Sequence, residues 1–219
     1  MSSAAQPGGY PYSDVVRPDV LAMIPADGRV IGSIGCGAAA TEAELVKSGR
    51  VVHGADVSAA AVRLAGTRLT SARLIDAGCT QPFAPGSLDG LILADVLEHL
   101  PAAWEALRTF TECVRVGGWL VISVPNMLYF GSLYQLLWKR DWPEMDTGIF
   151  DRTHIQFMTR RRLERWCANS GLEVEKTFGR YDPNGPRRTR AGQLLDKLSF
   201  GLLREFCIYQ IQIQCRRTR

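Results

Sequence analysis

Short apolar runs alternate along the chain with longer segments whose apolar positions recur at helical spacing. The apolar runs predict β-strands at 29–35, 50–57, 72–76, 88–95 and 117–126. The segments between them predict helices at 38–49, 58–66 and 101–114. Strands that alternate with helices in this way are typical of a parallel sheet covered by helices on both faces.

Capping residues mark several of these helix boundaries. Gly49 follows the first predicted helix, Ser58 precedes the second, and Pro101 falls in the first turn of the third. A fourth helix is expected over 159–171, with Thr159 as its cap. The predicted elements therefore begin and end where local chemistry favours a helix terminus.

The pattern changes after Pro125. Residues 172–181 and 205–217 predict two further strands, and the second alternates apolar and polar residues, as an antiparallel strand near a sheet edge does. Between them we expect a loop rich in Pro, Arg and Gly and then a short apolar helix over 194–203. The expected fold class is α/β, with a doubly wound, seven-stranded, mostly parallel sheet, an antiparallel last strand, and a helical, aromatic cap.

Length and composition narrow the function classes. We expect residues 1–219 to form a single domain, with a mobile N-terminus at 1–13. The net charge of +4 is low for a general nucleic-acid binder, so no nucleic-acid partner is expected. No segment has the apolar length of a membrane span, and the N-terminus lacks the pattern of a signal peptide. These features favour a cytoplasmic protein, and the richness in alanine and arginine favours a bacterial source.

The six cysteines show no CxxC pair and no ligand-like spacing to histidine. We therefore expect reduced, mostly buried thiols and no metal site. The oligomeric state is left open, with a homodimer among the alternatives.

A glycine-rich turn carries the first functional indication. Gly35 and Gly37 follow a predicted strand and precede a helix, so a ligand can approach bare backbone amides there. Asp56 ends the second strand, where a carboxylate can accept hydrogen bonds from both hydroxyls of a ribose. The pair indicates a nucleoside-containing ligand. Because "GCGAAA" also fits the dinucleotide fingerprint, NAD and an adenosyl cofactor both remain open, as does a tight turn without a ligand.

The next block separates these candidates. Asp76 follows the third predicted strand, a Pro82-Phe83 turn and Asp89 come next, and "DVLEHL" at 95–100 ends the fourth strand. Together with "GGWLVISVPN" at 117–126, this order resembles the central block of class I S-adenosylmethionine-dependent methyltransferases. The resemblance is close over 28–126 and looser to the end. It implies a Rossmann-like methyltransferase fold and S-adenosylmethionine as cofactor, with S-adenosylhomocysteine as product.

The resemblance also implies cofactor-binding residues. Gly35 and Gly37 would hold the methionine part, Asp56 the ribose, and Val57 would lie against the adenine. The remaining implied residues are Asp76 and Ala77 at the adenine amino group, and Ala94 and Asp95 beside the sulfonium. Asp56 and Asp76 also have structural interpretations, as a helix cap and a solvated loop acid.

One departure from the family pattern bears on the cofactor site. The family usually places an acid two residues before the first glycine, and here that place is Ser33. Ser33 can hydrogen-bond to the cofactor, but it offers no charge to the ammonium group. The later family glycine is replaced by Ala39. The departure keeps a non-catalytic, cofactor-binding protein among the alternatives.

Two histidines are candidates for acid–base chemistry, because an alcohol acceptor loses a proton during methylation. His154 lies in "IFDRTHIQFMT", which resembles a segment of methyltransferases associated with sugar, glycan and natural-product modification. We expect His154 to be the base, with Asp151 or Arg152 orienting it or the substrate. His99 lies in "LEHL", near the expected sulfonium. Loop packing is the structural alternative for both histidines, and His53 is expected to be structural.

The segments 126–158 and 182–203 are expected to be insertions that cap the acceptor side. Aromatic residues in the first suit an uncharged or sugar-like acceptor, although Tyr134, Leu137 and Trp138 at helical spacing also fit a core. A basic run in the second, with Arg187, Arg188 and Arg190, is either a solvated loop or a phosphate contact.

The sequence thus favours O-methylation of a sugar or natural-product acceptor, including a sugar-nucleotide or glycan-linked one. The alternatives are a non-catalytic or MetW-like partner protein and, less favoured, an NAD-dependent oxidoreductase.

Overall fold

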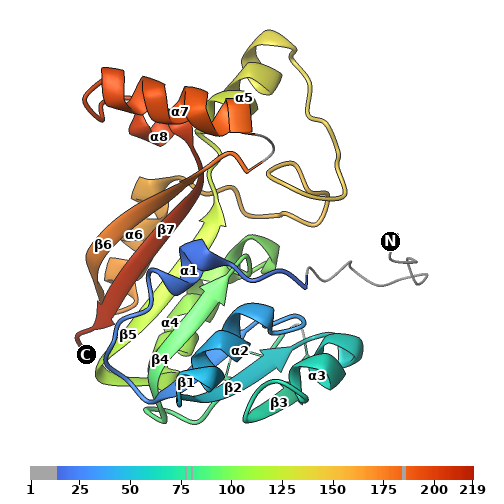
Figure 1. Ribbon diagram of the computed structural model, residues 1–219, viewed down its shortest axis with the longest axis vertical. Coiled ribbons are helices and arrows are strands. Elements are labelled where there is room, and N and C mark those ends of the chain that lie inside the picture. The colour runs from blue at the N-terminus through green and yellow to red at the C-terminus, as the bar shows by residue number, and fades with distance from the viewer. Residues whose placement is uncertain (1–13, 77, 80, 184–185) are drawn as a thin grey trace.

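The computed structural model describes residues 14–76, 78–79, 81–183 and 186–219, so the expectations for the N-terminal 13 residues and for Ala77 lie outside the described residues. Its centre is a seven-stranded sheet in the order β3-β2-β1-β4-β5-β7-β6 (Figure 1). The strands are β1 (Val30–Ile34), β2 (Val51–Asp56), β3 (Ser71–Leu74), β4 (Leu88–Ala94), β5 (Val114–Pro125), β6 (Leu172–Tyr181) and β7 (Ile208–Arg217). Neighbours from β3 to β5 are parallel, and β7 is antiparallel to both β5 and β6. The expected sheet, including its antiparallel last strand, is confirmed.

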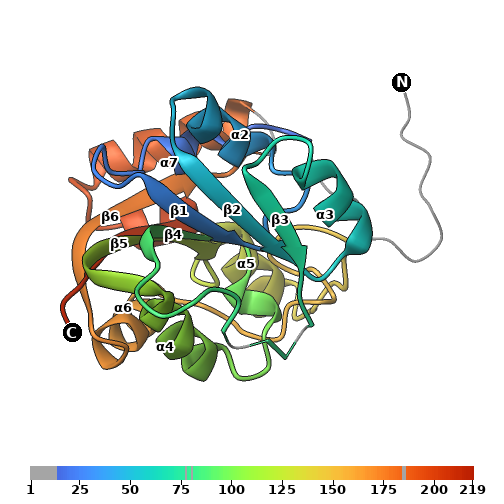
Figure 2. The same ribbon diagram turned by 90° about the horizontal axis from the view of Figure 1, so that it is seen from below.

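Helices cover both faces of this sheet. They are α1 (Pro18–Leu21), α2 (Ala40–Lys47), α3 (Ala59–Ala65), α4 (Ala103–Cys113), α5 (Phe130–Leu133), α6 (Arg160–Asn169), α7 (Pro186–Leu198) and α8 (Arg204–Cys207), with a 3₁₀ turn η1 (Leu97–His99) and a π-helical turn η2 (Tyr134–Trp138). In Figure 2, α2 lies on one side of the sheet and α4 and α6 on the other. Two buried clusters result, one shared by β4, β5, β7, α4 and α6, and one by β1, β2, α1 and α2. No described helix has the length and apolar character required to cross a lipid bilayer.

The predicted caps explain where the helices start. The Ser58 hydroxyl accepts a hydrogen bond from the Ala61 amide at 3.3 Å, and Thr159 accepts one from the Arg162 amide at 3.3 Å. Each satisfies an amide that the first helical turn leaves without a partner. Pro101 lies just before α4 rather than in its first turn, since Ala102 is the capping residue.

The Trp119 side chain packs closely against Gly90 where β5 pairs with β4. Trp119 of β5 is fully buried, and its indole N–H donates to the Asp27 carbonyl at 2.9 Å. Gly90 is its register partner on β4, and a Cβ at that position would lie 2.2 Å from the indole. The indole thus occupies the space that a side chain at Gly90 would need.

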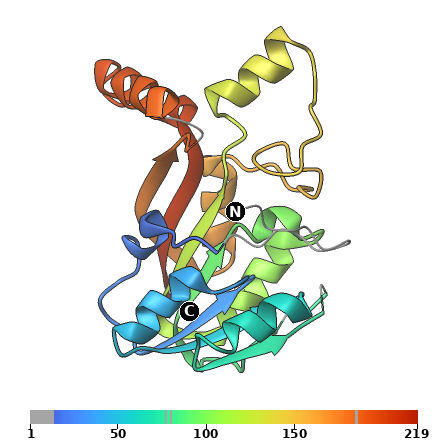
Figure 3. The ribbon, with the colours of Figure 1, turned by 45° about the vertical axis from the view of Figure 1, so that its right-hand side comes forward.

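The segments that follow β5 and β6 differ from the expectation in two respects. The basic run expected as a loop forms the first turns of α7, because proline at a first helical position and the following Arg, Ala, Gln and Leu all suit a helix. Tyr134, Leu137 and Trp138 are 46%, 75% and 77% exposed, so the core alternative for them is wrong. Figures 1 and 3 show α5 and α7 beyond the carboxyl end of β5.

Candidate active site

The glycine turn lies at the point where the sheet order reverses, between β1 and β4. Gly35 and Gly37 have positive φ angles of 65° and 54°, which glycine adopts without strain. A Cβ at Gly35 would lie 2.7 Å from Cγ2 of Val96, so a larger residue would collide there. Ala39, in place of the family's glycine, has a φ of 57° and caps α2 at a conformational cost of about 1 kcal/mol.

Asp56 joins this turn to the end of β2. Its carboxylate accepts hydrogen bonds from the Gly37 amide at 2.8 Å and from the Ser58 amide at 2.8 Å. Asp56 thus has a structural role in joining the two turns, although the cap of α3 is Ser58 and not Asp56. The same bonds hold the buried carboxylate beside the bare glycine backbone. Val57 is 57% exposed next to it, and Asp76 is exposed just beyond β3, the neighbour of β2.

Glu42, which the sequence analysis did not single out, contacts Ser33, the residue at the place of the family's acid. The Ser33 hydroxyl donates to Oε1 of Glu42 at 2.7 Å, and both side chains are buried. Burial raises the pKa of Glu42, and the hydrogen bond from Ser33 opposes this shift. A carboxyl group thus lies next to Ser33, but it comes from α2 instead of from β1.

Asp95 is held by residues from distant parts of the chain. It has a φ of 58°, and its carboxylate accepts hydrogen bonds from Arg17 at 2.6 Å and from the Gln210 amide at 2.6 Å. The Arg17 amide also donates to the Thr41 hydroxyl at 3.0 Å. The segment around Arg17 therefore links α2, on the glycine side, to the turn after Ala94, where the sulfonium is expected.

His99 and His154 meet at the carboxyl end of the sheet. Their ring centroids are 4.8 Å apart in an edge-to-face arrangement. Nδ1 of His99 lies 3.0 Å from the Thr153 hydroxyl, which in turn donates to Asp151 at 2.6 Å. Burial and then the neighbouring His154 lower the pKa of His99, so its imidazole is neutral at pH 7. The two candidate histidines and Asp151 thus form one polar cluster.

Asp151 and Arg152 were expected to orient His154 or the substrate, and the side chains of both contact other residues. Asp151 is buried, and its carboxylate accepts from the amide and the hydroxyl of Thr153, which contacts His99. Arg152 pairs with exposed Asp146 at 2.8 Å. Nδ1 of His154 lies 3.1 Å from the Ile149 carbonyl, which fixes its ring.

Glu98 is a second acid that the sequence analysis passed over. It is 1% exposed, and neither carboxylate oxygen has a hydrogen-bond partner among the residues that the structure describes. Burial and then the nearby charge of Asp95 raise the pKa of Glu98 well above its usual range. Its position beside His99 in "LEHL" was the only signal in the sequence.

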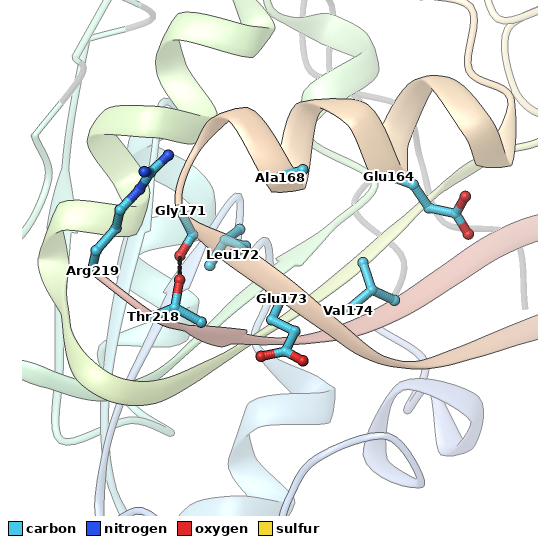
Figure 4. A pocket seen from close by; sticks show the side chains of 8 residues that line it. All are labelled: Glu164, Ala168, Gly171, Leu172, Glu173, Val174, Thr218 and Arg219. Atoms are coloured by element: carbon cyan, nitrogen blue, oxygen red, sulfur yellow. Dashed lines mark hydrogen bonds between the residues drawn. The ribbon is translucent and has the colours of Figure 1, made fainter.

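The hollow drawn in Figure 4 lies elsewhere. Its lining residues are Glu164, Ala168, Gly171, Leu172, Glu173, Val174, Thr218 and Arg219. These residues surround the start of β6, where the Thr218 hydroxyl donates to the Gly171 carbonyl at 3.0 Å. Because β6 and β5 are both antiparallel to β7, this hollow is at the amino ends of the strands, opposite the glycine turn.

Comparisons with known proteins agree with this geometry. A family model described as a methyltransferase domain matches residues 12–177. The chain is 25% identical over 173 residues to a ubiquinone biosynthesis O-methyltransferase of Thiobacillus denitrificans, which covers 73% of this chain and 71% of that protein. A solved structure of a SAM-dependent methyltransferase from Archaeoglobus fulgidus has a TM-score of 0.61 at 18% identity, with 86% of each chain covered. An S-adenosylmethionine-dependent methyltransferase from Mesorhizobium loti has a TM-score of 0.63 at 16% identity, with 91% and 96% covered.

The family match spans most of the chain, and the fold and the glycine–Asp56 geometry agree with it. The chain therefore belongs to the class I S-adenosylmethionine-dependent methyltransferases. It is an enzyme, and its cofactor is S-adenosylmethionine. This assignment leaves the NAD-dependent alternative without support.

Proposed function

We propose that the protein methylates a hydroxyl group of a small-molecule acceptor, a sugar or another natural product. The observation that carries the proposal is the pair formed by His99 and His154, whose rings meet at the carboxyl end of the sheet. A neutral imidazole there can accept the proton that an alcohol loses as it is methylated. The relative from Thiobacillus denitrificans is named for O-methylation in ubiquinone biosynthesis, which supports oxygen as the methylated atom.

The cofactor supplies a methyl group on a sulfonium, which is already an activated leaving group. The residues present fit this group, because Gly35 and Gly37 leave backbone exposed and Asp56 lies beside them for the ribose. The protein's own task is to align the acceptor oxygen and to remove its proton. In this account His154 is the base, and Asp151 positions His99 through Thr153.

The two segments 126–158 and 182–203 form the acceptor-side cap in this proposal. Figure 3 shows α5 and α7 beyond the carboxyl end of β5, and the glycine turn also follows the carboxyl end of its strand, β1. Exposed aromatic side chains in these segments include Phe130, Trp138 and Phe200. Such surfaces suit an acceptor with apolar or sugar-like faces.

A cytoplasmic location is also part of the proposal. All six cysteines are free thiols, five of them buried. This state is typical of proteins in a reducing compartment.

The test is incubation with methyl-labelled S-adenosylmethionine and a panel of sugars and phenolic natural products, with products identified by mass spectrometry. We expect a methyl ether as the product and a loss of turnover of about 10²-fold or more in His154→Gln. His53→Gln is the matched control, because His53 lies in β2 and contacts Ser71. Methylation of nitrogen or carbon alone would contradict the proposal, and full turnover in His154→Gln would contradict the base assignment.

A further inference from the structure

Three side chains with metal-ligating atoms converge next to the acceptor side. Glu98, His99 and His154 each offer one ligand atom, and these atoms all lie within 4.8 Å of one another. Two of the residues follow β4 and the third comes from the loop before α6. Only the fold brings them together, which is why the spacing in the sequence predicted no metal site.

The hydrogen bonds of the two histidines fix their tautomers. The Ile149 carbonyl can only accept, so Nδ1 of His154 must donate to it. The Thr153 carbonyl, 3.3 Å from Nδ1 of His99, imposes the same tautomer on that ring. In its uncharged form, each ring then carries its lone pair on Nε2. Carbonyl and hydroxyl partners on the second nitrogen are the usual support of metal-bound histidines.

The Glu98 carboxylate supplies the independent observation. It is almost fully buried, and its two oxygens have no hydrogen-bond partner among the described residues. A buried carboxylate without any partner costs several kcal/mol, so native proteins pair such groups with donors or with a cation. Of the charged groups that act on Glu98, Arg17 favours the ionised carboxylate, whereas Asp95 and Asp151 disfavour it. The imidazoles of His99 and His154 present ligand atoms within 4.8 Å of its own.

We propose that Glu98, His99 and His154 form a binding site for a divalent cation of the borderline class, such as Zn²⁺. Two imidazoles and one carboxylate are a ligand set that such cations prefer. Three protein ligands leave coordination positions for small molecules, as in catalytic sites. The buried Asp151, linked to His99 through Thr153, contributes further negative charge nearby.

The role of the cation rests on the proposed function. A cation held by these residues would bind the acceptor hydroxyl and lower its pKa. The hydroxyl proton passes to water, the acceptor oxygen forms a bond to the methyl carbon, and the carbon–sulfur bond breaks to release S-adenosylhomocysteine. With the cation bound, Nε2 of His154 would hold the metal, so this role would replace the role of base that the proposed function gives to His154, and water would take the proton.

The test is titration of metal-free, full-length protein with Co²⁺, followed by visible absorption, and with Zn²⁺, followed by calorimetry. We expect stoichiometric binding, a ligand-field spectrum of a nitrogen and oxygen site, and at least tenfold weaker binding in Glu98→Gln and His154→Gln. His53→Gln should bind like the wild type. Thermal midpoints and S-adenosylhomocysteine binding establish that each variant is folded.

Three results would overturn the site. They are no binding by the wild type, binding that Glu98→Gln and His154→Gln leave unchanged, and a spectrum dominated by thiolate-to-cobalt charge transfer.

Removal of the cation by a chelator tests whether the bound cation takes part in methyl transfer, which the binding experiments do not test. Loss of methyl transfer after chelator treatment and recovery with Zn²⁺ would support the role, and turnover that survives complete removal of the cation would overturn it. If the cation binds as expected but no hydroxyl is methylated, the site stands and the proposed function fails.

Discussion

The hydroxyl of Ser33, in β1, donates a hydrogen bond to the carboxyl group of Glu42, in α2, at 2.7 Å. Both side chains are buried, so this bond ties the helix to the strand. An acid is therefore present where the family pattern expects one, although it is contributed by a residue nine positions further along the chain. A carboxyl group therefore lies beside position 33 even though the residue there is a serine.

The first prediction concerns this acid. Glu42→Gln should weaken binding of S-adenosylhomocysteine by about tenfold, because a carboxylate near the ammonium group favours it by about 1–2 kcal/mol. Methylthioadenosine, which lacks the amino-acid part, should bind both proteins equally. Calorimetry with the two ligands measures the difference. Glu44→Gln, on the exposed side of the same helix, is the control, and equal losses for both ligands would refute the assignment.

A second prediction follows from the raised pKa of Glu42. Since the folded-state pKa lies above the ordinary value of 4.5, the stability contributed by the protonated acid is present below that value and is lost as pH rises through the folded-state pKa. Ligand-free Glu42→Gln should therefore lose less stability than the wild type between pH 5 and 8. Urea unfolding at several pH values tests this, and parallel pH profiles would show that Glu42 does not titrate as described.

The third prediction concerns Arg17, which reaches Asp19, Asp95 and Gln210. Arg17→Met should lower the free energy of unfolding at pH 7 by about 2 kcal/mol, because it removes hydrogen bonds to partly buried carboxylates. Burial opposes ionisation of Asp19, but its bond to Arg17 prevails and lowers its pKa below 3.8, so this contribution is present above pH 3.8 and fades as pH falls further. Arg63→Met, on the exposed face of α3, serves as control. An equal loss at pH 7 and pH 3 would contradict the ion-pair origin.

The fourth prediction tests the packing of β4 on β5. Gly90→Ala should destabilise the protein by about 2–3 kcal/mol, because the new methyl group would overlap the Trp119 indole. Thermal or urea unfolding gives the size of the effect. Gly78→Ala is the control, since no atom lies within 4 Å of a Cβ at that glycine. Unchanged stability of Gly90→Ala would mean that the indole can move aside.

The fold could be predicted from the sequence because the patterns that indicate its elements each span only a few residues. Strand runs, the Ser58 and Thr159 caps and the glycine turn each depend on a few adjacent residues, and all are found where expected. The site residues that escaped prediction are charged side chains whose partners lie far along the chain. Arg17 contacts Gln210, and nothing near either residue indicates the other.

Charged residues within helices are also ambiguous by themselves. Glu42 lies between Thr41 and Ala43 in an alanine-rich helix, and a glutamate in a helix usually faces solvent. Only the packing of α2 over Ser33 buries it. The basic start of α7 is a helix where the sequence predicts a loop, because its proline and glycine favour a turn and the residues between them favour a helix.

The most direct test of the central claim is calorimetric titration of the purified protein with S-adenosylmethionine and S-adenosylhomocysteine, repeated with Asp56→Ala and with Glu173→Ala. Glu173 lies at the start of β6, at the opposite end of the sheet, and serves as the matched control. The account predicts micromolar binding of both ligands that is lost in Asp56→Ala and retained in Glu173→Ala. Absence of binding by the wild type, or binding that Asp56→Ala leaves intact, would contradict a cofactor site built on the glycine turn and Asp56.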